Sequence, residues 1–286
     1  MILRIMGGFI CLALAYIVWQ YIELKRFGVT EYTIDSPLLK KEHGLVVLAD
    51  LHGFSYGANN GRLMERIRSL EPALILIAGD MIVSKYPDTY KEAVRTLASL
   101  TEIAPVYYAM GNHESRANRE GMRVYPAFVA YQKEAKALGV HFLQNERALL
   151  RLQGDAICLS GLEIGLEYYE KGTIVPLDGS YLTKQLGASS EAFQILLAHN
   201  PAYSEEYAAW GADLTFCGHY HGGLIRLPKI GSLLSPQLTW FPKYNSGSHR
   251  INGKRVIISR GLGTHTFHIR IFNRAELVCV HLKPGR

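Results

Sequence analysis

The chain has 286 residues and a formal net charge of +6, from 31 Lys and Arg residues against 25 Asp and Glu. Residues 1–26 hold three basic residues and one acidic residue, so residues 27–286 carry a net charge of +4. This mild excess, without dense Lys/Arg clusters, argues against a nucleic-acid-binding protein. An anionic substrate or an anionic membrane surface would fit the charge, and a solvated basic face explains it equally.

The cysteine pattern argues against a disulfide framework. No Cys-x-x-Cys pair occurs among the four cysteines, which are Cys11, Cys158, Cys217 and Cys279. The last three lie in strand-like apolar runs, where cysteine is most simply a core residue.

The first predicted element is the almost uninterrupted apolar run of residues 5–22. About 18 helical residues nearly span a hydrocarbon core of roughly 30 Å. A cleavable signal peptide is the alternative, because Ala13-Leu14-Ala15 has a small-x-small form. Cleavage there would leave apolar residues at the new terminus. We therefore predict that residues 1–26 are an uncleaved, single-pass anchor in the cell membrane, with the lipid bilayer as a partner.

The side of the membrane that holds the remaining chain stays open. Basic residues after the apolar run (Lys25, Arg26, Lys40 and Lys41) outnumber the single Arg4 before it, which favours a cytoplasmic domain. A short N-terminal tail followed by an uncleaved signal often takes the opposite orientation.

Strand and helix patterns alternate through the next part of the chain. Residues 27–43 are expected to be a connector that includes an edge strand at Glu31–Ile34. The alternation that follows comprises strands 45–49, 74–78 and 105–109 and helices 63–70, 90–100 and 125–138. This order predicts an α/β fold with a mainly parallel sheet and helices on its face.

Short strands dominate after residue 140. We expect them at 140–142, 148–152, 156–161, 194–198, 213–217, 248–251, 254–259, 270–272 and 277–282. The Asn252-Gly253 pair is a hairpin turn between two of these strands. No second domain boundary is evident, so residues 44–286 are expected to form one domain.

Five of the strand-like runs end in side chains that can bind a metal. Asp50 and His52 follow 45–49, Asp80 follows 74–79, Asn112 and His113 follow 104–110, His199 follows 195–198, and His219 and His221 follow 214–218. Ligands bind outside the carboxyl ends of strands in an open α/β sheet. Each residue alone has a simpler explanation as a turn residue or helix cap, but together the five runs predict one site.

The residue types at this site favour two divalent ions. Carboxylate, amide and imidazole groups together suit Mn, Fe or Zn and exclude none of them. Seven ligands exceed what one tetrahedral ion takes, whereas two ions that share a carboxylate use all seven. Asp80, at the end of the central strand, is the expected bridge, because a carboxylate has one oxygen for each ion.

The motif set resembles that of the calcineurin-like metallophosphoesterase superfamily in order and spacing. The matching motifs are Asp50-x-His52, Gly79-Asp80, Gly111-Asn112-His113-Glu114, His199 and Gly218-His219-Tyr220-His221. The resemblance covers roughly residues 44–282 and implies a four-layer α/β/β/α sandwich and a binuclear metal centre. The membrane-anchored bacterial branch, with phosphodiesterases and UDP-2,3-diacylglucosamine pyrophosphatases, is the branch that the chain resembles.

The resemblance also implies roles for the site residues. One ion would take Asp50, His52, Asp80 and His221, and the other would take Asp80, Asn112, His199 and His219. A hydroxide between them would attack phosphorus, while His113 protonates the leaving group or steadies the transition state. Two positions depart from the family pattern. At the first, Val83 stands where some members have an Asp that orients the catalytic histidine, so a backbone carbonyl or Asp50 is the candidate to orient His113. At the second, Leu224 stands where many relatives in this branch have a Gln.

The expected function is hydrolysis of a phosphodiester or pyrophosphate bond, with lipid-linked and nucleotide-linked esters as candidate substrates. The alternatives are an inactive scaffold of the same fold that binds a partner, and a phosphomonoesterase or nuclease of the same superfamily. We expect a monomer that does not bind nucleic acid.

A loop that follows His221 is expected to contact the substrate. Residues 222–245 are unusually apolar, and three prolines break any long strand within them. Part of this loop, Leu224–Leu227, is expected to complete the core of the second sheet. The predicted contacts to an acyl or prenyl group are Leu233, Leu234, Trp240 and Phe241.

Overall fold

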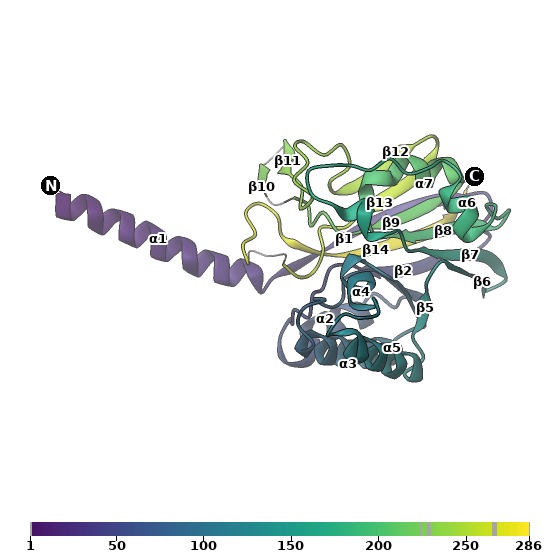
Figure 1. Ribbon diagram of the computed structural model, residues 1–286, viewed down its shortest axis with the longest axis horizontal. Helices are drawn as coiled ribbons and strands as arrows, with labels where there is room; N and C mark the ends of the chain where they lie inside the picture. The colour runs from purple at the N-terminus through teal and green to yellow at the C-terminus, as the bar shows by residue number, and fades with distance from the viewer. Residues whose placement is uncertain (1, 224, 228–229, 265–267, 286) are drawn as a thin grey trace.

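A computed structural model describes residues 2–223, 225–227, 230–264 and 268–285. Helix α1 (Ile2–Leu24) extends away from a domain that contains the remaining elements (Figure 1). The described residues of that domain form two six-stranded sheets and one two-stranded hairpin.

The first sheet has the strand order β1-β14-β2-β3-β4-β5. Its strands are β1 (Phe27–Ser36), β2 (His43–Leu48), β3 (Leu74–Ala78), β4 (Val106–Ala109), β5 (His141–Leu143) and β14 (Ala275–Pro284). Strands β2 to β5 are parallel, and β14 pairs antiparallel with β2. The carboxyl ends of β2, β3 and β4 therefore meet at one edge.

The second sheet has the order β12-β13-β9-β8-β7-β6. Its strands are β6 (Glu146–Leu152), β7 (Asp155–Leu162), β8 (Phe193–Ala198), β9 (Leu214–Cys217), β12 (Gly247–Ile251) and β13 (Lys254–Ile258). The four central strands are parallel, and an antiparallel hairpin closes each edge. The remaining hairpin, β10 (Ile225–Leu227) with β11 (Gly231–Leu234), lies outside both sheets.

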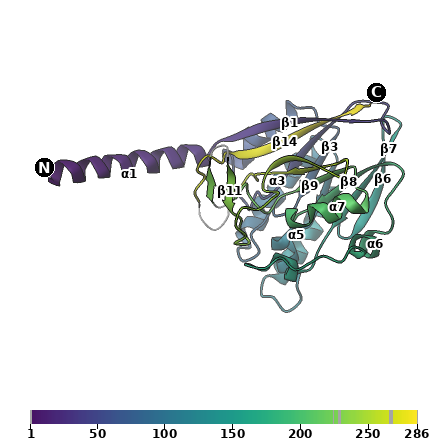
Figure 2. The same cartoon turned by 90° about the horizontal axis from the view of Figure 1, so that it is seen from above.

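Helices cover the outer face of each sheet (Figures 1 and 2). The first sheet carries α2 (Gly61–Arg68), α3 (Asp88–Thr101) and α5 (Tyr125–Ala137), and the second carries α6 (Tyr181–Leu186) and α7 (Ser204–Trp210). Short helical segments are η1 (Ala58–Asn60), α4 (Asn112–Ala117), η2 (Leu166–Tyr169) and η3 (Pro201–Tyr203). Helix α2 illustrates why the helices pack on the sheets, because its apolar residues Leu63, Met64 and Ile67 share one buried face.

Strand β3 explains how the layers pack. Leu74, Leu76 and Ala78 lie in the core between the two sheets, while Ile75 and Ile77 face the helices. Successive side chains of a strand point to opposite faces, so a strand covered on both sides is apolar throughout. The order of layers is therefore helices, sheet, sheet, helices.

The predicted alternation of strands and helices and the mixed α/β class are confirmed. Residues 27–36, part of the expected connector, form β1 at the edge of the first sheet. The strand expected at 270–272 is wrong, because this segment is irregular. Arg270 is buried there and its guanidinium bonds to backbone carbonyls, whereas Ile271 and Phe272 are exposed.

Helix α1 has the length and composition of a membrane span. Its segment Met6–Leu24 has a mean hydropathy of 1.5 and is 12% buried. A signal sequence meets the same description.

Candidate metal centre

The residues predicted to bind metal lie together at the carboxyl ends of strands from both sheets. The first sheet contributes those that follow β2, β3 and β4, and the second contributes those that follow β8 and β9. All seven are buried: Asp50, His52, Asp80, Asn112, His199, His219 and His221.

The backbone at this site adopts conformations that most residues avoid. Five of the seven have a positive φ, namely Asp50 (52°), His52 (50°), Asp80 (57°), His219 (65°) and His221 (49°). Such strain in residues other than glycine concentrates at functional sites. Glycine is needed beside them, because a Cβ on Gly111 would lie 2.2 Å from Asp80 Oδ1. The local fold is therefore arranged around these side chains.

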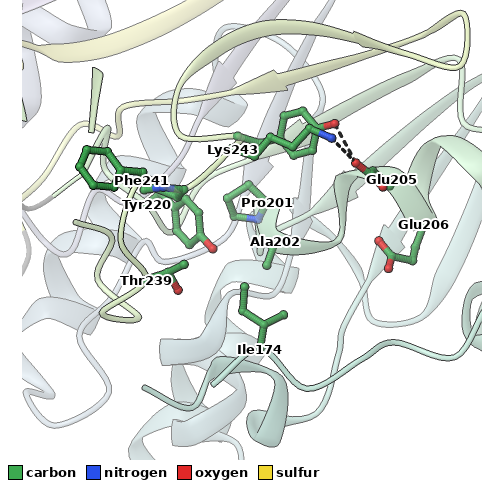
Figure 3. Close-up of a pocket in the computed structure, with 11 residues that line it drawn as sticks. Ile174, Pro201, Ala202, Glu205, Glu206, Tyr220, Thr239, Phe241 and Lys243 are labelled. Carbon is green, nitrogen blue, oxygen red and sulfur yellow. Dashed lines mark hydrogen bonds and ion pairs between the residues drawn. The ribbon is translucent and has the colours of Figure 1, made fainter. Parts of the chain in front are cut away.

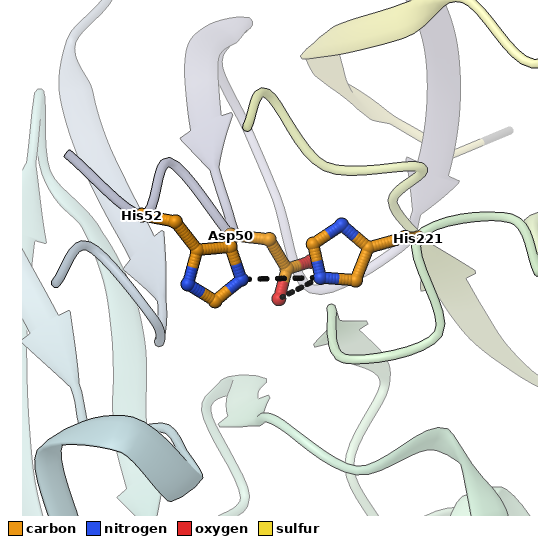
Figure 4. A group of neighbouring side chains, drawn as sticks. All are labelled: Asp50, His52 and His221. Atoms are coloured by element: carbon orange, nitrogen blue, oxygen red, sulfur yellow. Dashed lines mark hydrogen bonds and ion pairs between the residues drawn. The ribbon is translucent and has the colours of Figure 1, made fainter. Parts of the chain in front are cut away.

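Asp50, His52 and His221 form one group of potential ligands (Figure 4). Asp50 Oδ1 lies 3.6 Å from His221 Nε2, and the Nε2 atoms of His52 and His221 are 3.1 Å apart. The Asp50 carboxylate also accepts the backbone N–H of His219 at 3.0 Å. This contact joins the β2 loop of the first sheet to the β9 loop of the second.

Asp80, His199 and His219 form a second group. His199 Nδ1 bonds the carbonyl of Ala78 at 2.6 Å, and its Nε2 lies 3.1 Å from Asp80 Oδ2. A carbonyl on the far nitrogen fixes a ligating histidine in this way. Asn112 Oδ1 is buried without a hydrogen-bond partner among the described residues. A divalent ion would satisfy this oxygen, so the side chains fit a metal.

One oxygen of Asp80 faces both groups. Asp80 Oδ2 lies 3.1 Å from His199 Nε2 and 3.9 Å from His52 Nε2. Asp80 Oδ1 instead accepts the backbone N–H of His113 at 2.8 Å. The two oxygens of Asp80 therefore have different surroundings: Oδ2 faces the two groups of potential ligands and Oδ1 accepts a backbone N–H.

His113 is oriented by a backbone amide. The N–H of Ser84 donates to His113 Nδ1 at 3.0 Å, whereas a backbone carbonyl or Asp50 was the expected partner. A neutral imidazole with Nδ1 as acceptor carries its proton on Nε2. Burial lowers the pKa of His113, although the charge of Asp80 opposes this, so the neutral ring is favoured.

The two buried carboxylates require positive charge nearby. Burial, aided by the charge of Asp80, raises the pKa of Asp50 to about 7. Burial would also raise the pKa of Asp80, but His199 and His113 hold it well below its usual value. Burial lowers the pKa of His199, yet Asp80 and Asp50 raise it to about 10. A divalent ion would supply the charge that His199 supplies here.

A family model described as calcineurin-like phosphoesterase matches residues 44–223, more than half of the chain. The chain belongs to the calcineurin-like phosphoesterase family. It is an enzyme that hydrolyses phosphoester bonds, and it has the Asp/His clusters that metal binding in this family requires.

Similar proteins support this assignment. The chain is 27% identical to the uncharacterized metallophosphoesterase YkuE of Bacillus subtilis, over 92% of this chain and 88% of that protein. It is 24% identical to the phosphodiesterase YaeI of Escherichia coli, over 74% and 71% of the two chains. The sulfate thiohydrolase SoxB of Thermus thermophilus superposes with a TM-score of 0.50 at 12% identity, over 80% of this chain and 53% of that one. The last similarity shows a shared fold alone.

Glu114 supports the phosphoesterase site without facing it. This fully buried carboxylate accepts backbone N–H groups from Asp80 (2.9 Å), Met81 (2.9 Å) and Gly111 (3.0 Å), and the Tyr108 hydroxyl (2.5 Å). It therefore fixes the turn that presents Asp80. The sequence offered a signal that our prediction did not use, because an acidic residue three positions after a helix N-cap can accept the N-cap backbone N–H, which is one half of a capping box.

Arg270 and Asn273 support the other side of the site. The Arg270 guanidinium donates to the carbonyls of Gly261 (3.0 Å) and Gly263, and the Gly263 N–H donates to the Asp50 carbonyl at 2.6 Å. Asn273 Nδ2 donates to the His221 carbonyl at 2.6 Å. Sequence reasoning missed both residues, which lie far along the chain from the ligands they support.

A pocket of about 280 Å³ is lined by residues next in sequence to some of the ligands, although by none of the seven ligands themselves (Figure 3). Its wall includes Tyr220, which lies between His219 and His221, and Pro201, which follows the His199-Asn200 pair. Of the four predicted substrate contacts, Phe241 lines the pocket. Trp240 is exposed, and Leu233 and Leu234 are half-buried on β11. Leu224 lies outside the described residues.

Proposed function

We propose that this phosphoesterase uses two divalent ions to hydrolyse a phosphodiester or pyrophosphate bond in an amphiphilic substrate. The position of Asp80 Oδ2, which faces His199 on one side and His52 on the other, carries the proposal. In this assignment one ion would be held by Asp50, His52, Asp80 and His221, and the other would be held by Asp80, Asn112, His199 and His219. The donor set suits manganese, iron or zinc.

The chain's own residues have separate tasks in this mechanism. Bound divalent ions would supply Lewis acidity and activate water. The buried carboxylates hold the two sites together, and Glu114 keeps Asp80 in place. His113 donates from Nε2–H towards the leaving oxygen, since Ser84 occupies its Nδ1.

The pocket beside His219 and His221 is the proposed place for the part of the substrate that does not react. Apolar Ile174, Phe241 and Pro242 lie in its wall together with polar groups. YaeI, a relative, is named as a phosphodiesterase, which supports a diester. The sequence motifs resemble those of UDP-2,3-diacylglucosamine pyrophosphatases, which makes a lipid-linked pyrophosphate a second candidate. Such a substrate would place an acyl chain against Trp240 and Phe241.

We also propose that α1 remains attached and anchors the enzyme in the cell membrane. Apart from a few residues at its end, α1 makes little contact with the domain. Gln20 and Glu23, however, bond to Arg270 and Arg274 of the domain. An intact mass of the membrane-fraction protein that begins at Met1 would support this, and a chain that begins at Tyr16 or later would contradict it.

Metal analysis of the purified enzyme tests the binuclear site. We expect two ions per chain, with hydrolysis of a bis-nitrophenyl phosphate that stops on chelation and returns with added manganese, iron or zinc. One ion per chain at full activity would contradict the two-ion mechanism. No metal and no hydrolysis under any of these additions would favour an inactive scaffold.

A further inference from the structure

Two separate segments expose large apolar side chains at the end of the domain where α1 begins to extend away. The β10–β11 region and the segment that precedes β14 both lie at this end in two perpendicular views (Figures 1 and 2). We call the following six exposed residues the apolar face: Leu238, Trp240, Phe241, Ile269, Ile271 and Phe272. Trp240, Phe241 and Phe272 each expose more than 60% of their surface.

The segment that holds Ile269, Ile271 and Phe272 is fastened to α1. Gln20 donates through Nε2 to the Arg270 carbonyl (3.2 Å) and accepts the Arg270 N–H through Oε1 (3.0 Å). One turn later, Glu23 pairs with Arg274 at 2.8 and 3.2 Å. Two paired contacts from successive turns of one helix fix its direction relative to this segment.

The segment that holds Leu238, Trp240 and Phe241 is joined to the same place. Asn273 Nδ2 donates to the carbonyl of Gly223, just before the β10–β11 hairpin, at 3.4 Å. Trp240 forms a bridge with Leu234 of β11, and the Phe241 N–H bonds the Leu233 carbonyl at 2.9 Å. Both apolar segments are therefore tied to the structure around the end of α1.

Three of the six residues are exposed in a strained backbone conformation. Leu238, Phe241 and Phe272 have φ values of 60°, 47° and 51°. A bulky residue with positive φ is an outlier that surrounding structure must maintain. Exposed apolar side chains held in such conformations suggest a function for the surface that they form.

We propose that the apolar face lies against the bilayer that α1 enters, with its six side chains at the level of the lipid headgroups and upper acyl chains. The inference rests on the proposed membrane anchor. Because α1 is fixed beside the face, a bilayer around the helix meets these side chains without any rearrangement. Lys25 and Arg26, at the junction of helix and domain, would face anionic lipid headgroups. This charge and the continuity with α1 favour a bilayer over a protein partner.

This position brings the catalytic site to the lipid surface. Asn273, which follows the face directly, bonds the carbonyl of His221, and Phe241 of the face lines the pocket beside the site. A substrate whose apolar part stays in the bilayer could then place its phosphate at the metal centre. The substrate class is therefore a membrane-resident phosphate ester.

Fluorescence of single tryptophans in the full-length enzyme tests the face. The chain has three tryptophans, Trp19, Trp210 and Trp240, so changing two to Phe leaves one reporter. The probe is a vesicle of phosphatidylglycerol and phosphatidylcholine brominated at shallow or deep acyl positions. We expect shallow bromine to quench Trp240 and also Trp19, because Trp19 precedes Gln20, which bonds Arg270 in one segment of the apolar face. Neither bromine position should quench Trp210 on α7.

The reporters separate failure of the face from failure of the anchor. Quenching of Trp19 without quenching of Trp240 would overturn the apolar face and leave the anchor intact. Quenching of neither would overturn both, while hydrolysis of a soluble ester would still report the metal-dependent activity.

A matched pair of variants tests the second segment. Ile271→Ser combined with Phe272→Ser removes two apolar side chains of the face, and Leu149→Ser removes an equally exposed one from β6, at the opposite end of the domain (Figure 1). We expect the first variant to lose Trp240 quenching and to hydrolyse a vesicle-embedded phosphodiester more slowly, with bis-nitrophenyl phosphate hydrolysed as before. Leu149→Ser should change neither. Unchanged quenching in the first variant, or a dimer in detergent that this variant disrupts, would overturn the proposal.

Discussion

The two sides of the metal centre are supported by buried side chains of opposite charge, Glu114 on one side and Arg270 on the other. On the Asp80 side, the Glu114 carboxylate accepts N–H groups from the turn that carries Asp80. On the other side, the Arg270 guanidinium donates to carbonyls of the loop that packs against Asp50. Each of these side chains forms hydrogen bonds with several backbone groups, which would be costly to bury without a partner.

The two supports differ in their origin along the chain. Glu114 follows the ligand Asn112 by two residues, so this half of the site is built locally. Arg270 lies 49 residues after His221, and its own backbone is held by Gln20 of α1. The support of the local half lies within loops of the first sheet, although this half also includes His199 and His219 from the second sheet. The support of the other half depends on the segment before β14 and on the N-terminal helix.

Asp80→Ala should have the largest effect, because it removes the residue at which the two halves meet. We expect loss of both ions and of hydrolysis with the fold retained, as measured by metal content, turnover and circular dichroism. Asp35→Ala, at an exposed position of β1, is the control and should change none of these. Two retained ions with near-normal turnover in Asp80→Ala would refute the shared ligand.

His113→Ala should leave both ions in place, because His113 contacts the local half without belonging to the proposed ligand sets. We expect turnover of an ester with a poor leaving group to fall by roughly 10²- to 10⁴-fold. A good leaving group, such as nitrophenolate, should reduce this loss. An unchanged rate with the poor leaving group would exclude His113 from the mechanism.

Much of the first sheet was predictable because its strands repeat one pattern. Strands such as β3 are buried on both faces and read as continuous apolar runs between helical segments. The prediction of a strand at 270–272 from its apolar residues was wrong, since Ile271 and Phe272 are apolar but exposed. The pattern of apolar residues in a sequence shows which residues are apolar, but it cannot distinguish apolar residues that are exposed from those that are buried.

The potential ligands were predictable as a set, because metal-binding side chains at several strand ends must meet at one edge. Of their two supports, Glu114 left a signal that our prediction did not use, an acidic residue three positions after a helix N-cap. Arg270 acts through backbone carbonyls and leaves no such pattern. The orientation of Asp80, with Oδ2 towards both groups, also depends on a contact that only the structure shows, the His113 N–H on Oδ1.

Glu114→Gln would weaken the local support. The amide oxygen can still accept N–H groups, but the new NH₂ faces backbone donors and leaves one without a partner. Since Asp80 is shared, we expect both ions to bind less tightly, by roughly 10- to 100-fold. Competition with a chelator measures this, and Glu134→Gln on the exposed side of α5 is the control. Weakening of a single ion would contradict the shared role of Asp80.

Arg270→Lys would weaken the distant support with a smaller effect. Lysine keeps the charge but lacks the planar fork that reaches several carbonyls at once. We expect weaker binding, by about tenfold, of the ion next to Asp50 and His221 only. Arg250→Lys, at an exposed position of β12, should bind both ions normally. Equal losses at both ions would mean that the two halves are not supported separately.

The smallest effect concerns pH and the proton of His113. The ratio of wild-type turnover to that of His113→Ala isolates this residue from other titrating groups.

Because burial lowers the pKa of His113 below the usual 6.5, the neutral ring persists from alkaline pH to below that value. A neutral Nε2–H donor predicts a constant ratio over this range, which falls only at lower pH, when protonation of Nδ1 displaces the Ser84 N–H. A protonated general acid predicts the opposite sign, since its contribution falls as pH rises through the pKa. A ratio that grows steadily from neutral to acidic pH would therefore contradict the donor role, and replacing Ser84 with proline, which has no N–H, should reduce the contribution of His113 at every pH.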